Sequence, residues 1–198
     1  MPEGNWFTFE EHVQACCACD LHRGIRNKVP GQGDPHSPLM FIGEGPGEQE
    51  DAQGLAFVGA AGQLLTRMLQ AISLPRERVY ICNVVKCRPP GNRTPDMQEM
   101  QACLPLLREQ FLLVRPRIII LLGATAARAV LNPDIRITRD RGRWVERKGV
   151  WFMATYHPSY LLRSPERKAE AWKDLQSLRA QLMAMKLYPD LYDTLHDN

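Results

Sequence analysis

The sequence lacks a long hydrophobic run. Its most apolar stretch, Phe111 to Leu122, is interrupted by Arg115, Pro116 and Arg117, whereas a membrane-spanning helix needs about 20 apolar residues. The first residues also lack an apolar segment preceded by basic side chains. We therefore expect neither membrane insertion nor secretion. No internal repeat and no low-complexity tract is visible.

Lysine is scarce, because 19 of the 25 basic residues are arginine, and the net charge is only +3. Arginine binds phosphate oxygens in a bidentate way, but a GC-rich genome also enriches arginine, so composition leaves nucleic acid as one option. Six cysteines without an export signal argue against a disulfide scaffold. They favour a metal, a cluster or buried thiols in a reducing compartment.

Short apolar strands alternate with helical patterns along the chain. Strands are expected at residues 39–43, 79–85, 117–123 and 150–155, the last in a hairpin with 144–145, and a long final helix follows Ser164. This order predicts an α/β fold, a three-layer α/β/α sandwich around a central, mostly parallel four-stranded sheet. We expect one domain over residues 1–187, opened by a helix that brings Cys16 and Cys19, and a flexible tail over residues 188–198.

Three chemistry-bearing segments follow predicted strands. The turn Gly43-Glu44-Gly45-Pro46-Gly47 comes after the first strand, Asn83 lies near the end of the second, and His157 follows the last. Glycines let backbone N–H groups approach a ligand closely, and ligands of such folds bind beyond the carboxyl ends of the strands. The sequence therefore predicts a ligand site at this edge, although such a turn can also be a tight connection only.

The cysteines have metal-ligand spacing. Cys16-x-x-Cys19 suits two thiolates on one metal centre, and Cys87 with Cys103 can complete a four-thiolate set. Spacing alone leaves zinc, an iron–sulfur cluster and no metal open. Cys17 and Cys82 are expected to be packing residues.

Five motifs in a fixed order carry a family resemblance: the turn from Gly43 to Asp51, Phe57-Val58-Gly59, Ile81-Cys82-Asn83, Lys86-Cys87-Arg88-Pro89-Pro90, and His157 to Leu162. Over roughly Val13 to Leu182, the chain resembles the family-four uracil-DNA glycosylases. The resemblance implies a glycosylase of α/β/α fold that removes uracil from DNA. It also implies a structural [4Fe–4S] cluster on Cys16, Cys19, Cys87 and Cys103.

Base flipping then assigns roles to the predicted site, because a base must leave the stack before its glycosidic bond can be reached. Phe57 is expected to stack on the base and Asn83 to read its edge. His157, as a neutral donor, is expected to stabilise the leaving uracil at O2. Gly43, Gly45 and Gly47 are expected to complete the binding site with backbone groups.

A carboxylate is needed to hold the attacking water beside a cationic sugar, and Glu44 is the first choice. The family-one glycosylases carry an aspartate where this chain has Gly45, so the role is not transferred from them. Glu48, Glu50 and Asp51 are rivals. Glu50 is also a candidate wall near C5 of the base, where it would exclude thymine.

Leu161, Leu162 and Arg163 occupy the position from which such glycosylases insert a wedge into DNA, and packing in the core is the alternative for each leucine. Arg88, Arg93 and the basic group between Arg136 and Lys148 are candidate phosphate contacts.

The sequence therefore predicts a monofunctional uracil-DNA glycosylase that leaves an abasic site. The alternatives are a glycosylase with a different choice of deaminated base, and a noncatalytic metal-cluster module that binds DNA in a replication or repair assembly. We expect a monomer, uracil-containing DNA as partner, no membrane, and a cytoplasmic location, on the nucleoid if the protein is bacterial.

Overall fold

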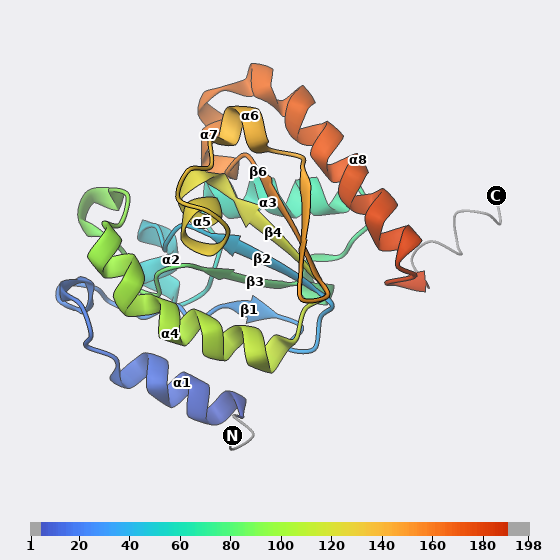
Figure 1. The fold of residues 1–198 in the computed structure, drawn as a ribbon. Coiled ribbons are helices and arrows are strands. Elements are labelled where there is room, and N and C mark those ends of the chain that lie inside the picture. The colour runs from blue at the N-terminus through green and yellow to red at the C-terminus, as the bar shows by residue number, and fades with distance from the viewer. Residues whose placement is uncertain (1–4, 190–198) are drawn as a thin grey trace.

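A six-stranded sheet forms the centre of the structure, a computed structural model that describes residues 5–189 (Figure 1). Its order is β1-β3-β2-β4-β6-β5, with the four central strands parallel and both edge strands antiparallel to their neighbours. The strands are β1 (Gln32–Gly33), β2 (Leu39–Gly43), β3 (Tyr80–Asn83), β4 (Ile118–Leu122), β5 (Trp144–Arg147) and β6 (Val150–Thr155).

The expected parallel core is confirmed, but the expected strand number of four is wrong. The two additional strands are the edges β1 and β5, and β5 is the expected hairpin partner of the last strand. β1 lies in a Gly- and Pro-rich segment with no apolar alternation, and Gly33 adopts a φ of +112°. A Cβ there would lie 1.9 Å from the carbonyl oxygen of Val79, so only glycine allows this pairing.

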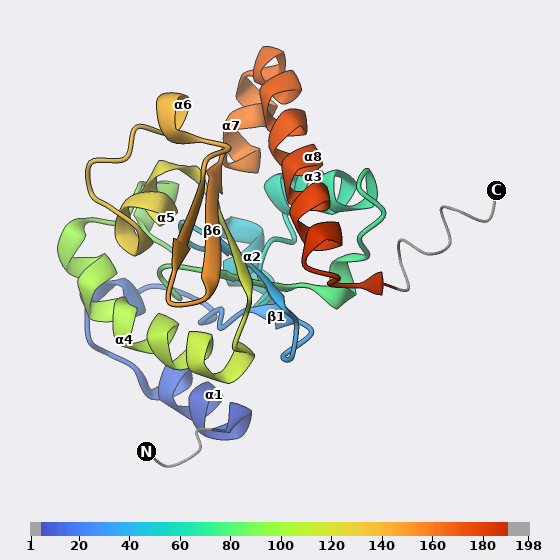
Figure 2. The same cartoon turned by 45° about the vertical axis from the view of Figure 1, so that its right-hand side comes forward.

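Helices cover both faces of the sheet, as Figures 1 and 2 show. One face carries α1, α4 and α5, and the other carries α3, α7 and α8, which makes the expected three layers. Within residues 5–189 the helices are α1 (Trp6–Ala15), α2 (Glu48–Gln53), α3 (Ala60–Gln70), α4 (Met97–Val114), α5 (Gly123–Val130), α6 (Ile137–Asp140), α7 (Pro158–Arg163) and α8 (Lys168–Ala184).

Alternation along the buried strands divides the core into two halves. Ile118, Ile120 and Leu122 face the α3/α8 side, while Ile119 and Leu121 face the α4/α5 side. Since successive strand residues point to opposite faces, an unbroken apolar strand is the pattern that a doubly covered parallel sheet requires.

Strand register aligns the carboxyl ends of the parallel strands. Gly43 pairs with Asn83, and Leu122 pairs with Thr155, two residues before His157. The sheet therefore brings the glycine-rich turn, Asn83 and His157 to one edge.

The carboxyl-terminal boundary is described only in part. Tyr188, which the sequence places in a flexible tail, is buried, and its hydroxyl lies 2.9 Å from Ser37 Oγ. Residues 190–198 of that expected tail lie outside the described residues. Among the helices described, none has the length and apolar character needed to cross a bilayer.

Candidate functional site

A cavity of about 470 Å³ opens at the carboxyl ends of the parallel strands. We call it the strand-end cavity. Ligand sites of open α/β sheets occur at this position. The predicted residues among those lining it are Glu44, Gly45, Gly47, Glu50, Phe57, Asn83, His157 and Arg163.

Gly43 lies directly beneath the cavity and leaves room for two of its side chains. A Cβ at Gly43 would lie 2.5 Å from both Phe57 Cζ and Asn83 Oδ1. Phe57 itself has a φ of 53°, and a Cβ on Gly62 would overlap its backbone. Gly43 therefore leaves the space that the Phe57 ring occupies, and Gly62 leaves the space for the Phe57 backbone.

Asn83 presents an unsatisfied acceptor. Its side chain is 1 % exposed, and within residues 5–189 its Oδ1 has no hydrogen-bond partner. A buried polar atom left without a partner costs about 1–3 kcal/mol, so such atoms in a cavity are typical of ligand contacts.

His157 is held as a neutral hydrogen-bond donor. It caps α7, and its Nδ1 accepts a hydrogen bond of 3.1 Å from the backbone N–H of Ser159, while Ser159 Oγ lies 2.8 Å from the same nitrogen. Burial, with a smaller effect from the positive charge of Arg163, lowers the pKa of His157 to about 4. The ring therefore carries its proton on Nε2 at neutral pH.

The His157 ring also contacts Phe57, with centroids 5.7 Å apart and planes inclined by 34°. Two rings from distant parts of the chain thus meet at the cavity. A planar apolar ligand could stack there while one edge reaches Asn83.

Glu44 is oriented by one neighbour. Thr125 Oγ1, from the start of α5, donates a hydrogen bond of 2.5 Å to Glu44 Oε2. Among the described residues, no hydrogen bond or ion pair engages Oε1 of this half-buried side chain. Glu44 can therefore accept a hydrogen bond from a molecule in the cavity.

The other carboxylates of the turn have different surroundings. Glu50 Oε1 accepts the backbone N–H groups of Val58 and Gly59, both at 2.8 Å, and Oε2 accepts that of Gly47 at 3.1 Å. Asp51 Oδ1 accepts the N–H of Arg26 at 2.9 Å. Both carboxylates therefore bind backbone N–H groups, and Glu50 does so while it lines the strand-end cavity.

The expected DNA contacts separate into two kinds. Leu161 is 1 % exposed and packs in the α3/α8 half of the core, which favours the alternative of core packing over contact with DNA. Leu162 is 39 % exposed and Arg163 lines the strand-end cavity. Successive helical residues point about 100° apart, which is why neighbouring leucines face core and solvent.

Among the candidate phosphate contacts, Arg141 is already engaged. Its guanidinium binds Asp174, with Nη2 2.6 Å from Oδ1 and Nε 2.9 Å from Oδ2. Arg93 lines the strand-end cavity while it forks onto Glu99, at 2.8 and 2.6 Å. Arg141 therefore serves the fold, whereas Arg93 is held at the cavity.

Sequence reasoning missed several polar residues of the cavity. These include Asn92, Thr94, Thr125 and Ser159. Ser159 belongs to the motif from His157 to Leu162 and could have been identified there. Thr125 lies in Gly-Ala-Thr, an ordinary helix start, and carries no signal of its own.

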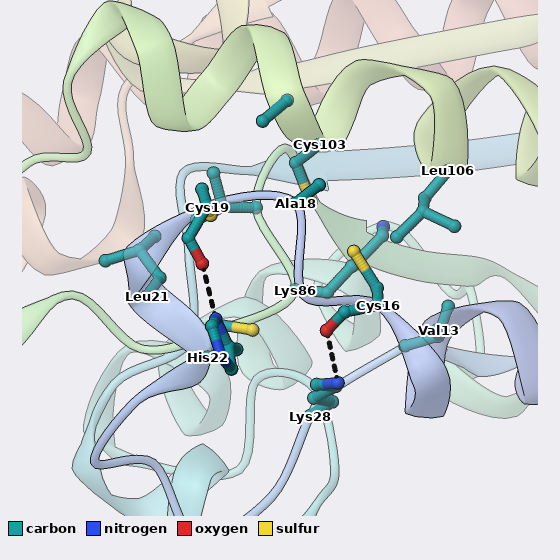
Figure 3. A pocket seen from close by; sticks show the side chains of 13 residues that line it. Val13, Cys16, Ala18, Cys19, Leu21, His22, Lys28, Lys86, Cys103 and Leu106 are labelled. Atoms are coloured by element: carbon teal, nitrogen blue, oxygen red, sulfur yellow. Dashed lines mark hydrogen bonds between the residues drawn. The ribbon is translucent and has the colours of Figure 1, made fainter.

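A second cavity is lined by all four predicted cysteine ligands, of which Cys16, Cys19 and Cys103 are labelled in Figure 3. We call it the four-cysteine cavity. Cys16 and Cys19 follow α1, Cys87 follows β3, and Cys103 lies on α4. Burial and the neighbouring thiols raise the pKa of Cys87 to about 12, and burial raises the pKa of Cys103 and, despite a backbone hydrogen bond, that of Cys19. A cationic centre would have to displace these protons.

The four cysteines give the cavity a set of soft sulfur donors, with apolar neighbours such as Val13 and Leu106. This donor set fits an iron–sulfur cluster, and thiolates also bind zinc. Cys82 is buried in the sheet, and Cys17 is exposed.

Comparison with known proteins places this geometry in a family. The sequence profile of the uracil DNA glycosylase superfamily matches residues 30–176. A type-4 uracil-DNA glycosylase of Thermotoga maritima is 48% identical over 158 residues, covering 78% of this chain and 81% of that protein. The type-4 uracil-DNA glycosylase of Archaeoglobus fulgidus is 42% identical over 191 residues, covering 92% of this chain and 95% of that protein. A type-5 uracil-DNA glycosylase of Pyrobaculum aerophilum is 35% identical over 150 residues, covering 67% of this chain and 66% of that protein.

Proposed function

Since the chain belongs to the type-4 uracil-DNA glycosylases of the uracil DNA glycosylase superfamily, we propose that it flips uracil out of DNA and hydrolyses its N-glycosidic bond. The reaction leaves an abasic site, the first product of base excision repair. The unsatisfied Asn83 Oδ1 in the strand-end cavity is the observation that carries the proposal.

Asn83 matches one edge of uracil. Its Oδ1 accepts the N3–H of the flipped base, and its amide donates to O4. Cytosine presents an unprotonated N3 and an exocyclic amine at those positions, so it would leave buried groups unpaired. Asn83 therefore selects strongly against cytosine, since one fixed pair of donor and acceptor cannot match the hydrogen-bonding edges of both bases. Phe57 stacks on the base and holds this edge against Asn83.

His157 stabilises the leaving group. Bond cleavage places negative charge on uracil O2 and positive charge on the sugar. The Nε2–H of the neutral ring donates to that oxygen, and the bond becomes stronger as the charge develops. The Ser159 N–H to Nδ1 hydrogen bond holds the required tautomer.

Glu44 positions the attacking water. Thr125 occupies Oε2, which leaves Oε1 for the water and places a negative charge near the cationic sugar. Leu162 enters the space that the flipped base vacates, and Arg163 and Arg93 lie where DNA phosphates pass the cavity.

Cys16, Cys19, Cys87 and Cys103 would hold a [4Fe–4S] cluster, which would supply a structural cross-link between three segments of the chain. The cluster would also restrain residues 88–94. This segment follows Cys87 and includes Asn92, Arg93 and Thr94, which line the strand-end cavity. Anchoring at Cys87 and Cys103 restrains this wall.

We propose a monomer, with one domain that spans the expected residues 1–187 and continues through the buried Tyr188. Its substrate places it with DNA in the cytoplasm, on the nucleoid if it is bacterial.

A uracil-containing oligonucleotide tests the activity. Incubation with the protein, followed by alkali, should cut the strand at uracil and leave cytosine and thymine controls intact. Asn83→Ala should lower kcat/KM at least about tenfold, equal to about 1.4 kcal/mol. Asn132→Ala, the same change at an exposed surface position, is the matched control. An intact uracil strand would reject the proposed function, and normal turnover by Asn83→Ala would reject the role of Asn83.

A further inference from the structure

Lys86 is a lysine with unusual surroundings. Its side chain is 1 % exposed, which is rare for this residue type. The ammonium donates to the backbone carbonyl of Asn83 at 2.8 Å and to Gln110 Oε1 at 2.6 Å. Both acceptors are neutral, and no carboxylate in residues 5–189 forms an ion pair with it. A buried charge is strongly unfavourable without an opposite charge nearby, so this ammonium calls for an anion.

Lys28 repeats the pattern on another segment. Its ammonium donates to the carbonyl oxygens of Gln14 at 2.6 Å and Cys16 at 2.5 Å, again neutral acceptors. Lys28 and Lys86 both line the four-cysteine cavity, and Figure 3 shows Lys28 bound to the backbone of Cys16. Two cationic side chains from separate segments therefore line the same cavity.

Acidic groups near the cavity have their own partners. Glu99 is bound by Arg93 at 2.6 Å, and Asp20 lies 3.5 Å from Arg23. Their charges are therefore partly compensated without either lysine.

Charge arithmetic connects these observations. Four thiolates around an oxidised [4Fe–4S] core, or around Zn²⁺, leave a net charge of two negative units, because either centre carries two positive ones. Two ammonium groups cancel that charge. We infer that Lys28 and Lys86 are the counter-charges of the metal centre on the four cysteines. The inference rests on the metal centre given under the proposed function.

Methionine substitutions test the inference, because methionine is close in length to lysine and uncharged. Lys28→Met and Lys86→Met should be purified beside the unaltered protein, and iron, zinc and protein measured in each. The rate at which a chelator removes the metal then measures how firmly the centre is held. Both variants should lose metal at least about fivefold faster, because the dianionic centre has lost a nearby positive charge. For an iron–sulfur centre, the reduction potential should move to more negative values, since adding an electron becomes less favourable.

Two controls separate charge from packing. Lys173→Met removes the same charge at an exposed position on α8 and should match the unaltered protein. Gln110→Met removes a hydrogen-bond partner of Lys86 but leaves the charge of Lys86 in place. It should therefore change the chelation rate and the reduction potential less than Lys86→Met does.

Unchanged chelation rate and potential in both lysine variants would overturn the inference while leaving the metal centre intact. An effect of Gln110→Met equal to that of Lys86→Met, with Lys28→Met unchanged, would also overturn it, because packing would then be the cause. An unaltered protein that carries neither iron nor zinc would reject the metal centre and the inference together.

Discussion

Gly43→Ala should disable the strand-end cavity although it adds a single methyl group. The new Cβ would lie 2.5 Å from Phe57 Cζ and from Asn83 Oδ1, whereas ordinary contacts begin at 3.4 Å. Ring and amide must therefore retreat by about 1 Å, a misplacement that can cost about 100-fold in rate. We expect kcat/KM on a uracil oligonucleotide to fall about 100-fold, or about 2.7 kcal/mol of transition-state stabilisation.

The backbone does not explain such a loss, because Gly43 lies in a strand and does not adopt a positive φ. Gly59→Ala is the matched control, since its Cβ would make contacts of 3.4 Å and longer. Thermal unfolding of both variants should accompany the kinetics, because overpacking costs about 1–3 kcal/mol of stability. A folded Gly43→Ala protein with activity within about twofold of normal would refute the argument that Gly43 sets the positions of Phe57 and Asn83.

Four further predictions follow from His157, Thr125 and Glu50. Because the pKa of His157 is about 4, His157 stays neutral between pH 7.5 and about 5.5, and its titration should not lower kcat/KM in that range. A fall in kcat/KM with a midpoint near pH 6.5 that depends on His157 would contradict this. Because the pKa of His157 is lower in the folded protein than in the unfolded chain, protonation of this residue favours unfolding. The contribution of neutral His157 to the free energy of unfolding should therefore be complete above about pH 6.5 and decline as the pH falls towards 4. Urea unfolding at each pH measures this decline. Thr125→Val should lower kcat about three- to tenfold with little change in KM, because the Glu44 carboxylate loses its orienting donor, and Thr125→Ser should restore it; equal losses in both variants would point to packing. Glu50→Gln should lower the free energy of unfolding by about 1.5–3 kcal/mol, since one carboxamide oxygen cannot replace an anion that accepts three N–H groups, and an unchanged melting temperature would contradict it.

The fold was predictable where sequence and environment agree. Residues 118–122 are apolar on both faces because helices cover both sides of the sheet, and that pattern is visible in the sequence. The edge strand β1 was not predictable, since two residues held by a close backbone approach at Gly33 have no periodicity. Backbone pairing, rather than side-chain pattern, determines it.

The candidate site divides in the same way. Asn83 and His157 were predictable because parallel strands place their carboxyl ends together. Positions 161 and 162 are both leucine, and only the packing of α7 on the core decides which of the two is exposed. The hydrogen bond from Thr125 to Glu44 joins segments 81 residues apart, so no local pattern could reveal it.

The three backbone hydrogen bonds of Glu50 also bear on the entropy of substrate binding. They join Gly47 to Val58 and Gly59, the two ends of the segment that carries Phe57. Ordering one residue of backbone costs about 1–2 kcal/mol, and here folding rather than DNA binding supplies that order. A flipped base therefore meets a surface that already has its final shape, and more of its contact energy remains for pulling the base from the helix.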